Sequence, residues 1–262
     1  MNRAATAASR AYHHPVRTQR TIIVESLLDA YRQGAFPMED PATGEVRFYY
    51  AMQRGIFPIA PDDPAGSFHI PRSLRRRLNS GFFTIRCDTA LDDVVRGCAE
   101  PRADDPETWI GAAITRWFSH LRHAGHAHSV EAWRRDPATG DDALVGGVYG
   151  LAIGAAFCGE SMFSRPRERL ASGARDPLDG TDASKVCLVH LVAHLRARGY
   201  VLFDTQLLNP HLDRLGCVEI PHEDYLDRLR DAVDRDVTWG AFEERWRARE
   251  PGRPRPGPCS SA

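Results

Sequence analysis

Lysine is almost missing from this chain of 262 residues. Lys185 is the one lysine among 34 basic side chains, so all the others are arginines. Acidic side chains number 35, and the formal net charge of −1 excludes a strongly basic coat for nucleic acid, although not a local basic patch. The composition, 42% hydrophobic and 26% charged, is ordinary for a globular protein and excludes a wholly disordered, collagen-like or coiled-coil chain.

Long hydrophobic runs are also absent. No segment approaches the ~18 apolar residues that span a membrane. Residues 1–20 lack the apolar core of ~7–15 residues that a signal peptide needs. None of the six cysteines stands in a C-x-x-C pair, which leaves zinc and redox motifs without support. These absences predict a cytoplasmic protein with reduced thiols, no membrane partner and no metal.

Nucleotide-binding loops are missing as well. The glycine-rich run Gly146–Gly154 fits neither G-x-x-x-x-G-K-[ST] nor G-x-G-x-x-G. Glycines in such a run let a ligand or another backbone come close to a strand. We therefore expect this segment to face an acyl or adenosine group, and we expect no cofactor.

Hydrophobic periodicity divides the chain into short helices and strands. In the N-terminal part it predicts a helix from Thr21 that ends at Gly34, a break at Phe36-Pro37, strands within 46–59 and a short helix over 71–79. From Gly81 onward it predicts a strand at 82–86, a helix at 91–98 and a second helix at 109–124 that is capped by Thr108. A strand at 127–133, a hairpin loop at 136–142, two strands within 144–163 and a polar loop at 165–182 follow. The last elements are an amphipathic helix at 186–198 capped by Asp182 or Ser184, a strand at 200–203 and a helix near 223–232.

This order predicts an α+β protein with one smaller and one larger domain. We expect a basic flexible arm at 1–20, a small N-terminal α/β domain at 21–80, a larger domain at 81–250 and a disordered tail at 251–262. The tail is rich in Pro, Gly and Ser and carries no core residue, which is typical of disorder.

Asp204 and Gln206 form the first candidate site, because they follow directly after a buried strand. Ligands often bind beyond the strand ends of sheets that contain parallel strands. A carboxylate there can orient or deprotonate an amine, and a Gln amide can donate to a carbonyl oxygen that becomes an oxyanion. Taken alone, Asp204 is more simply explained as the cap of the next turn.

Glu160 is the second candidate. In the run Gly159–Ser164 it sets one anionic group beside Ser161, Met162 and an aromatic side chain, and its simpler explanation is a strand end exposed to water. Ser161 does not stand in the G-x-S-x-G pattern of a nucleophile elbow. A third group, His126 and His128, shares one strand face while Glu131 alternates away, which favours structural histidines over a metal site.

Basic side chains cluster at one place. Arg72, Arg75, Arg76 and Arg77 lie within six residues on the expected short helix, a pattern that by itself is typical of a solvated helix face. Lys185 stands at the start of a later helix. A lone lysine there is either chance or a site that needs a compact ammonium in place of a planar guanidinium.

A collinear series of motifs resembles the leucyl/phenylalanyl-tRNA–protein transferase family over about residues 22–230. The matching runs are Tyr31–Met38, Phe68–Arg76, Thr108–Ile110, Gly125–Trp133, Leu144–Gly150, Phe157–Ser164, Ala183–Lys185 and Asp204–Gln206, followed by Asn209, His211 and Leu212. The chain departs from the family's W-W-S-P or W-Y-S-P at Tyr49–Met52, and its 165–182 loop is longer than usual.

The resemblance implies a GNAT-like acyltransferase fold for the larger domain. It implies transfer of Leu or Phe, with Met as an open third donor, from aminoacyl-tRNA to the α-amino group of proteins that begin with Lys or Arg. The new N-terminus is a degradation signal of the N-end rule pathway. Because an aminoacyl ester is already activated, the reaction needs neither ATP nor a metal.

The resemblance also assigns roles. Gln206 contacts the ester carbonyl, and Asp204 holds Gln206 or steers the amine, with proton transfer to Asp204 left open. Glu160 attracts a cation in the substrate pocket. The remaining expected contacts are an apolar pocket of Val148, Phe157, Met162 and Leu188, adenosine stacking on Trp109 and Tyr50, and tRNA phosphates on Arg72, Arg75, Arg76 and Arg77.

Three rival functions stay open at this point. An enzyme of the same fold that uses acyl-CoA usually carries an R/Q-x-x-G-x-G/A loop, which is absent from the sequence. A transferase with the same donor but another acceptor residue is compatible with the long 165–182 loop. A catalytically silent tRNA-binding protein is disfavoured by the presence of both Asp204 and Gln206.

Overall fold

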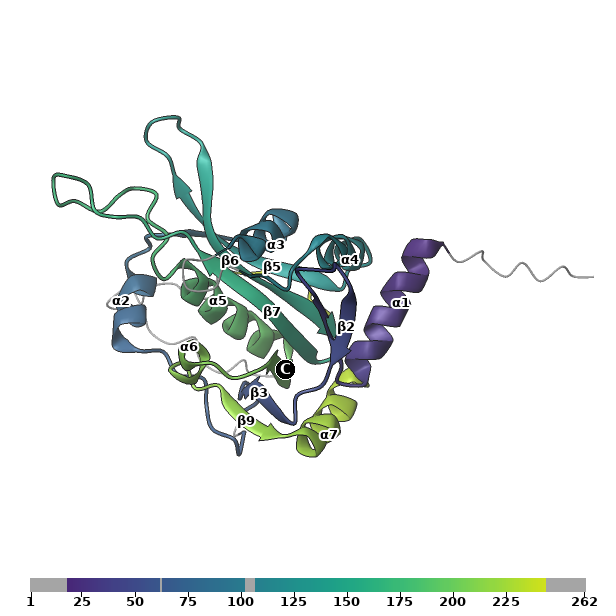
Figure 1. The fold of residues 1–262 in the computed structure, drawn as a ribbon. Coiled ribbons are helices and arrows are strands. Elements are labelled where there is room, and N and C mark those ends of the chain that lie inside the picture. Colours follow the sequence, from purple (N-terminus) through teal and green to yellow (C-terminus); the bar gives the residue numbers. More distant parts are fainter. Residues whose placement is uncertain (1–17, 62, 102–106, 244–262) are drawn as a thin grey trace, which may run out of the picture.

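The computed structural model describes residues 18–61, 63–101 and 107–243. The expected tail at 251–262 and nearly all of the expected arm at 1–20 lie outside these residues. The strands form a seven-stranded sheet in the order β4-β5-β6-β7-β8-β3-β9 and a separate two-stranded ribbon, β1-β2 (Figure 1). The prediction of an α+β protein is confirmed.

The large sheet is mixed. Its strands are β3 (Gln53–Phe57), β4 (Thr84–Cys87), β5 (Ala127–Arg135), β6 (Asp142–Ile153), β7 (Ala156–Ser164), β8 (Leu202–Gln206) and β9 (Val218–Pro221). All neighbouring strands run antiparallel except β7 and β8, which run parallel. The ribbon consists of β1 (Phe36–Glu39) and β2 (Val46–Tyr49), so a strand stands where the sequence predicted a break.

Helices cover both faces of the large sheet. They are α1 (Gln19–Arg32), α2 (Arg72–Asn79), α3 (Leu91–Ala99), α4 (Ala112–His123), α5 (Ala183–Arg198), α6 (Pro210–Asp213) and α7 (His222–Val233). Figure 1 shows α3 and α4 on one side of β5–β7 and α5 on the other. None of the helices within the described residues is long and apolar enough to cross a membrane.

Alternation along the central strands builds two cores. Val148 packs into the core on the α5 side, and its neighbour Tyr149 packs into the core beneath α1, α3 and α4. Phe157 and Cys158 divide between the same two cores. The glycine-rich run Gly146–Gly154, which was expected to face a ligand, therefore also lies between the two cores.

Helix α5 is buried over almost its whole length. Exposed side chains occur only in its last turn, so the prediction of an amphipathic helix was wrong. The face turned away from the sheet is covered by α2 and by Trp239, whose ring lies 4.5 Å from that of His194. Neither predicted side-chain cap forms. Asp182 occupies the cap position but binds Lys185 Nζ at 2.9 Å, and the backbone N–H of Ser184 donates to Ser164 Oγ at 2.9 Å.

Strand β3 connects the N-terminal part to the large sheet. Although the sequence placed it in the small N-terminal domain, it lies between β8 and β9. The boundary expected near residue 80 therefore does not separate two sheets.

Glu39 at the end of β1 caps helix α4. Its carboxylate accepts the backbone N–H groups of Ala113 and Ile114 at 2.9 and 3.1 Å, which satisfies two free donors at the helix N-terminus. Thr108, the predicted cap, lies four residues before the helix begins, and its hydroxyl accepts the N–H of Ile110 instead. The cap is supplied from a distant strand, which also binds the carbonyl of Trp109 through its own N–H.

Candidate active site

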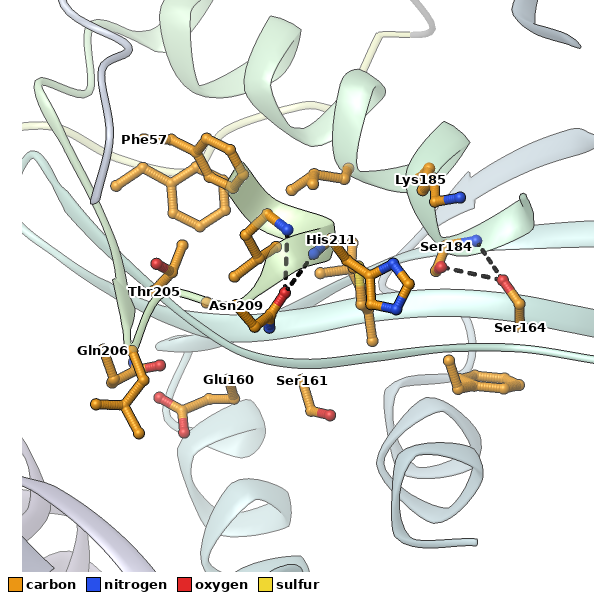
Figure 2. A pocket seen from close by; sticks show the side chains of 18 of the residues that line it. Phe57, Glu160, Ser161, Ser164, Ser184, Lys185, Thr205, Gln206, Asn209 and His211 are labelled. Carbon is orange, nitrogen blue, oxygen red and sulfur yellow. Dashed lines mark hydrogen bonds between the residues drawn. The ribbon is translucent and has the colours of Figure 1, made fainter. Parts of the chain in front are cut away.

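A cavity of about 660 Å³ opens beside the ends of β7 and β8. Figure 2 shows Glu160, Ser161, Gln206, Asn209, His211 and Lys185 around it. Its apolar lining consists of Phe36, Pro37, Met38, Phe57, Trp109, Val148, Met162, Phe163, Pro166, Leu188, Phe203, Leu207 and Leu212. Such a mostly apolar hollow with a few polar groups is typical of a ligand site.

The cavity begins where the parallel strands stop pairing. β7 and β8 pair from Ala156 and Leu202 up to Cys158 and Asp204. Beyond this point β7 continues to Ser164 and β8 to Gln206 without further pairing between them. Glu160 and Gln206 lie on the segments of β7 and β8 that no longer pair with each other. Their side chains therefore reach a space that the sheet leaves open between the two strands.

Gln206 is held in a tight and unusual turn. Its φ of 57° is left-handed, and the N–H of Leu207 closes the turn on the carbonyl of Thr205 at 2.7 Å. The register against β3 shifts at the same place, since Gly55 pairs with Gln206 and Ile56 with Asp204, so Thr205 is an extra residue. The amide Nε2 is buried without a hydrogen-bond partner among the described residues. A buried donor of this kind is free for a ligand.

Asp204 lies behind Gln206 and is fully buried. Its Oδ1 accepts Arg54 Nε at 2.7 Å and the backbone N–H of Gln206 at 2.8 Å. Its Oδ2 accepts Arg54 Nη2 at 2.6 Å and the hydroxyl of Tyr225 at 3.0 Å. The side chain does not line the cavity. Asp204 is therefore placed to hold Gln206.

Arg54 is the buried partner of Asp204. Burial by itself lowers the pKa of the guanidinium, but the charge and hydrogen bonds of Asp204 outweigh burial and raise that pKa above its ordinary value. The guanidinium therefore stays charged, and it forms an ion pair with Asp204. Arg54 also stacks on the rings of Phe36 and Tyr225, at 4.9 and 4.3 Å from their centroids.

Glu160 lines the cavity and accepts the hydroxyl of Tyr31 at 2.9 Å. Burial raises the pKa of this carboxyl to about 8, while the Tyr31 hydrogen bond lowers it and the charge of Asp204 raises it further. Glu160 therefore keeps most of its proton at pH 7, where a carboxyl exposed to water is already ionised.

Most of the residues predicted for the pocket do meet there. Trp109, Val148, Ser161, Met162, Lys185 and Leu188 all line the cavity. Phe157 does not, because it lies one layer behind, edge-on to the lining residue Phe203 at 5.4 Å. Tyr50 lies outside the lining, 56% exposed, with its ring edge-on to His222.

The predicted basic patch lies on α2. Arg72, Arg75 and Arg76 are exposed, and no ion pair of the described residues includes them. Arg77 is half-buried and stacks on Phe82 and Phe83 at 4.8 and 5.7 Å. The patch does not line the cavity.

The two histidines expected to be structural, His126 and His128, both lie within hydrogen-bond distance of protein groups, His126 Nδ1 being 3.2 Å from the carbonyl oxygen of Ala152. His128 Nδ1 lies 2.9 Å from Asp88 Oδ2, and its ring stacks on Trp239 at 4.1 Å. Glu131 is buried and accepts hydrogen bonds from Thr89, Ala90 and Ser129. Within the part of the chain that the structure describes, no group of three or more His, Cys, Asp or Glu side chains is arranged to hold a metal ion.

Comparison with known proteins decides the family. Residues 64–230 match the family described as leucyl/phenylalanyl-tRNA protein transferase. A leucyl/phenylalanyl-tRNA–protein transferase of Paramagnetospirillum magneticum is 48% identical over 84% of this chain and 93% of its own length. The corresponding protein of Chlorobaculum parvum is 43% identical over 82% of this chain and 98% of its own length. The chain belongs to the leucyl/phenylalanyl-tRNA–protein transferase family.

The family makes this chain an enzyme of the aminoacyltransferase class. Among solved structures, that of FemX is similar over 75% of this chain and 66% of that chain, with 10% sequence identity and a TM-score of 0.47.

Three residues of the candidate site were not predicted from the sequence. Arg54 stands inside the mostly apolar run Ala51–Ile59, and a charge in such a run was the one available signal. Tyr31 and Tyr225 were expected only as members of helices. Their hydroxyls reach Glu160 and Asp204 across 129 and 21 residues, and no local pattern reveals such partners.

Proposed function

We propose that this chain transfers Leu or Phe from aminoacyl-tRNA to the α-amino group of proteins that begin with Lys or Arg. The product carries a new N-terminus that acts as an N-end-rule degradation signal. One observation carries the proposal: the unpartnered amide of Gln206 lies at the edge of an apolar cavity in a member of this family. Met is an open third donor.

The reaction is an exchange of an ester for an amide. The α-amine nitrogen attacks the ester carbonyl carbon, and the bond from that carbon to the ribose oxygen breaks. The nitrogen loses one proton and the departing ribose oxygen gains one, so no proton is consumed overall. The α-amine, with a pKa of about 7.7–8.0, is partly neutral near pH 7 and needs little activation.

Gln206 donates its Nε2–H to the carbonyl oxygen as negative charge develops there. Asp204 keeps Gln206 in place through its backbone N–H. Glu160 attracts a cation, either the ammonium of the aminoacyl group or the basic side chain of the acceptor. Holding donor and acceptor together in this way can supply roughly 7–11 kcal/mol of the barrier.

The donor side chain enters the apolar part of the cavity. Val148, Met162 and Leu188 line it, with Phe157 behind them as support. An apolar pocket distinguishes one methylene by only ~1–3 kcal/mol, which favours overlapping use of Leu, Phe and Met. Ser161 and Lys185 are the polar groups on the same lining.

The tRNA lies against two surfaces in this proposal. Trp109, at the cavity, stacks on the terminal adenosine, and exposed Tyr50 contributes a second stacking surface nearby. Arg72, Arg75, Arg76 and Arg77 contact phosphates of the acceptor stem. The proposal includes a GNAT-like larger domain after a small N-terminal one, and a cytoplasmic location supported by the free thiols of the described cysteines.

A split between binding and transfer tests the proposed chemistry. In Gln206→Ala we expect kcat for transfer of Phe from Phe-tRNA to an Arg peptide to fall about 100- to 1,000-fold, which leaves a measurable rate, while Phe-tRNA binding persists. Arg228→Lys, a variant of an ion pair outside the cavity, is the control. Equal loss of binding and transfer in Gln206→Ala refutes the role given to Gln206.

A further inference from the structure

Arg54 and Asp204 form an ion pair closed off from water directly behind the cavity. Both side chains have 0% exposure. Two parallel hydrogen bonds of 2.7 and 2.6 Å join the guanidinium to the carboxylate. A buried ion pair is weak as a source of stability, because desolvation of both charges opposes their attraction. Stability alone therefore does not explain why this pair is present.

The guanidinium is fixed from several elements at once. Nη1 donates to the carbonyl of Gly34 at 2.9 Å, and Nη2 reaches the hydroxyl of Tyr225 at 3.2 Å. The rings of Phe36 and Tyr225 stack on it. These contacts tie β3, α7 and the chain around Gly34 to a single carboxylate.

We propose that Arg54 is a positioning residue for the transfer reaction, acting through Asp204 to hold Gln206 in its left-handed turn at the cavity wall. The inference rests on the proposed role of Gln206. The same atom, Asp204 Oδ1, accepts both Arg54 Nε and the backbone N–H of Gln206. A residue other than glycine keeps a φ of 57° only where its surroundings enforce it.

The same contacts remove Asp204 from proton transfer. Each of its oxygens already accepts two hydrogen bonds, and Arg54 balances its charge. It has no surface on the cavity. The proton that leaves the amine therefore passes to the ribose oxygen by a route that does not include Asp204.

Arg54→Lys tests the inference, since lysine keeps the charge but loses the two-pronged geometry. We expect kcat with Phe-tRNA and an Arg peptide to fall about 100-fold, as a misplaced catalytic group does, with an unchanged KM for Phe-tRNA. The matched control is Arg228→Lys, on α7, whose Nη1 lies 3.1 and 3.2 Å from the two carboxylate oxygens of Asp63. It should leave both constants unchanged.

A double-mutant cycle separates positioning from a merely structural role. In a Gln206→Ala background, Arg54→Lys should cause no further loss of kcat, because Arg54 acts only through Gln206. Additive losses, or a rise in KM at constant kcat, would overturn the inference about Arg54 alone. Full kcat in Gln206→Ala would instead overturn the proposed role of Gln206, and the inference with it.

Tyr225→Phe keeps the test decisive if Arg54→Lys does not fold. It removes one hydrogen bond to Asp204 Oδ2 and leaves the ion pair in place. We expect a smaller loss of kcat that is again absent in the Gln206→Ala background. An additive loss with Tyr225→Phe overturns the inference equally.

Discussion

The hydroxyl of Tyr31, on the first helix of the chain, donates a 2.9 Å hydrogen bond to Glu160 in the cavity wall. Tyr31 is almost completely buried, and burial raises the pKa of its phenol well above the ordinary value, so it is a fixed donor. The bond connects α1 to the end of β7. The carboxyl that accepts it is half-buried and lines the same cavity as Gln206.

The free energy of unfolding should decrease as pH rises, because Glu160 has a raised pKa in the folded protein. Its pKa is about 8 in the folded protein and near 4.5 when unfolded, so between these values the folded state holds a proton that the unfolded state lacks. The contribution to stability is complete below about pH 4.5 and is lost as pH rises toward 8. We expect urea unfolding at pH 5.5, 6.5, 7.5 and 8.5 to show a decline in wild type of up to ~1.4 kcal/mol per pH unit relative to Glu160→Gln. Parallel pH profiles of the two proteins would contradict this.

The Gln206→Gly variant should be more stable than the Gln206→Ala variant. At a φ of 57° alanine carries strain that glycine avoids, of about 1 kcal/mol or slightly more. Both variants lose the amide, so the backbone is the remaining difference. Thermal unfolding should give Gln206→Gly a higher Tm than Gln206→Ala, and transfer should be slowed to a similar extent in both. A higher Tm for the alanine variant would show that the turn is not strained.

Gly111→Ala should weaken the attachment of α4 to β1. A Cβ at this position would lie 2.2 Å from the carboxylate carbon of Glu39, so the cap must move. Overpacking of this kind costs about 1–3 kcal/mol, and we expect a lower Tm together with a raised KM for Phe-tRNA, since Glu39 also holds Trp109. Gly111→Ala in a Glu39→Ala background is the control, because the carboxylate that the new Cβ would meet is then absent. An equal loss of Tm in the two backgrounds would argue against the cap.

The exposed arginines of α2 should set the salt dependence of tRNA binding. Each phosphate contact contributes about 0.7–0.9 to the slope of log K against log salt. Replacing Arg72, Arg75 and Arg76 by Gln should therefore flatten that slope by about 2–3. A matched variant replaces three ion-paired arginines elsewhere, Arg96, Arg230 and Arg235, and should keep the wild-type slope. An unchanged slope in the α2 variant would remove this patch from the tRNA interface.

Local patterns account for much of the fold. The helices near 21–33, 71–79 and 91–98 and the strands near 82–86 and 127–133 are confirmed, because hydrophobic spacing within each segment determines which face is buried. The ribbon β1-β2 was missed although its turn repeats a readable signal. The run Asp40-Pro41-Ala42-Thr43-Gly44 is identical to Asp136–Gly140, whose hairpin was predicted. In both, the N–H of the glycine closes on the carbonyl of the aspartate at 2.8 Å.

Distant partners account for what the sequence did not reveal. The cap of α4 comes from Glu39, and the face of α5 that should have been polar is covered by Trp239 and α2. Asp204 and Gln206 were identified, but Arg54 lies 150 residues from Asp204 in sequence. The bulge that turns Gln206 toward the cavity depends on Gly55 across the sheet, where a Cβ would lie 2.8 Å from Thr205 Oγ1.

The most direct test of the account is a transfer assay with defined donors and acceptors. Purified protein would be given labelled Leu-, Phe- and Met-tRNA and peptides that begin with Lys, Arg, Asp, Glu or Ala, with and without a chelator. We predict label from Leu and Phe on Lys and Arg peptides alone, unaffected by the chelator and strongly reduced with Gln206→Ala. Label on Asp or Glu peptides, or no transfer despite bound tRNA, would contradict it.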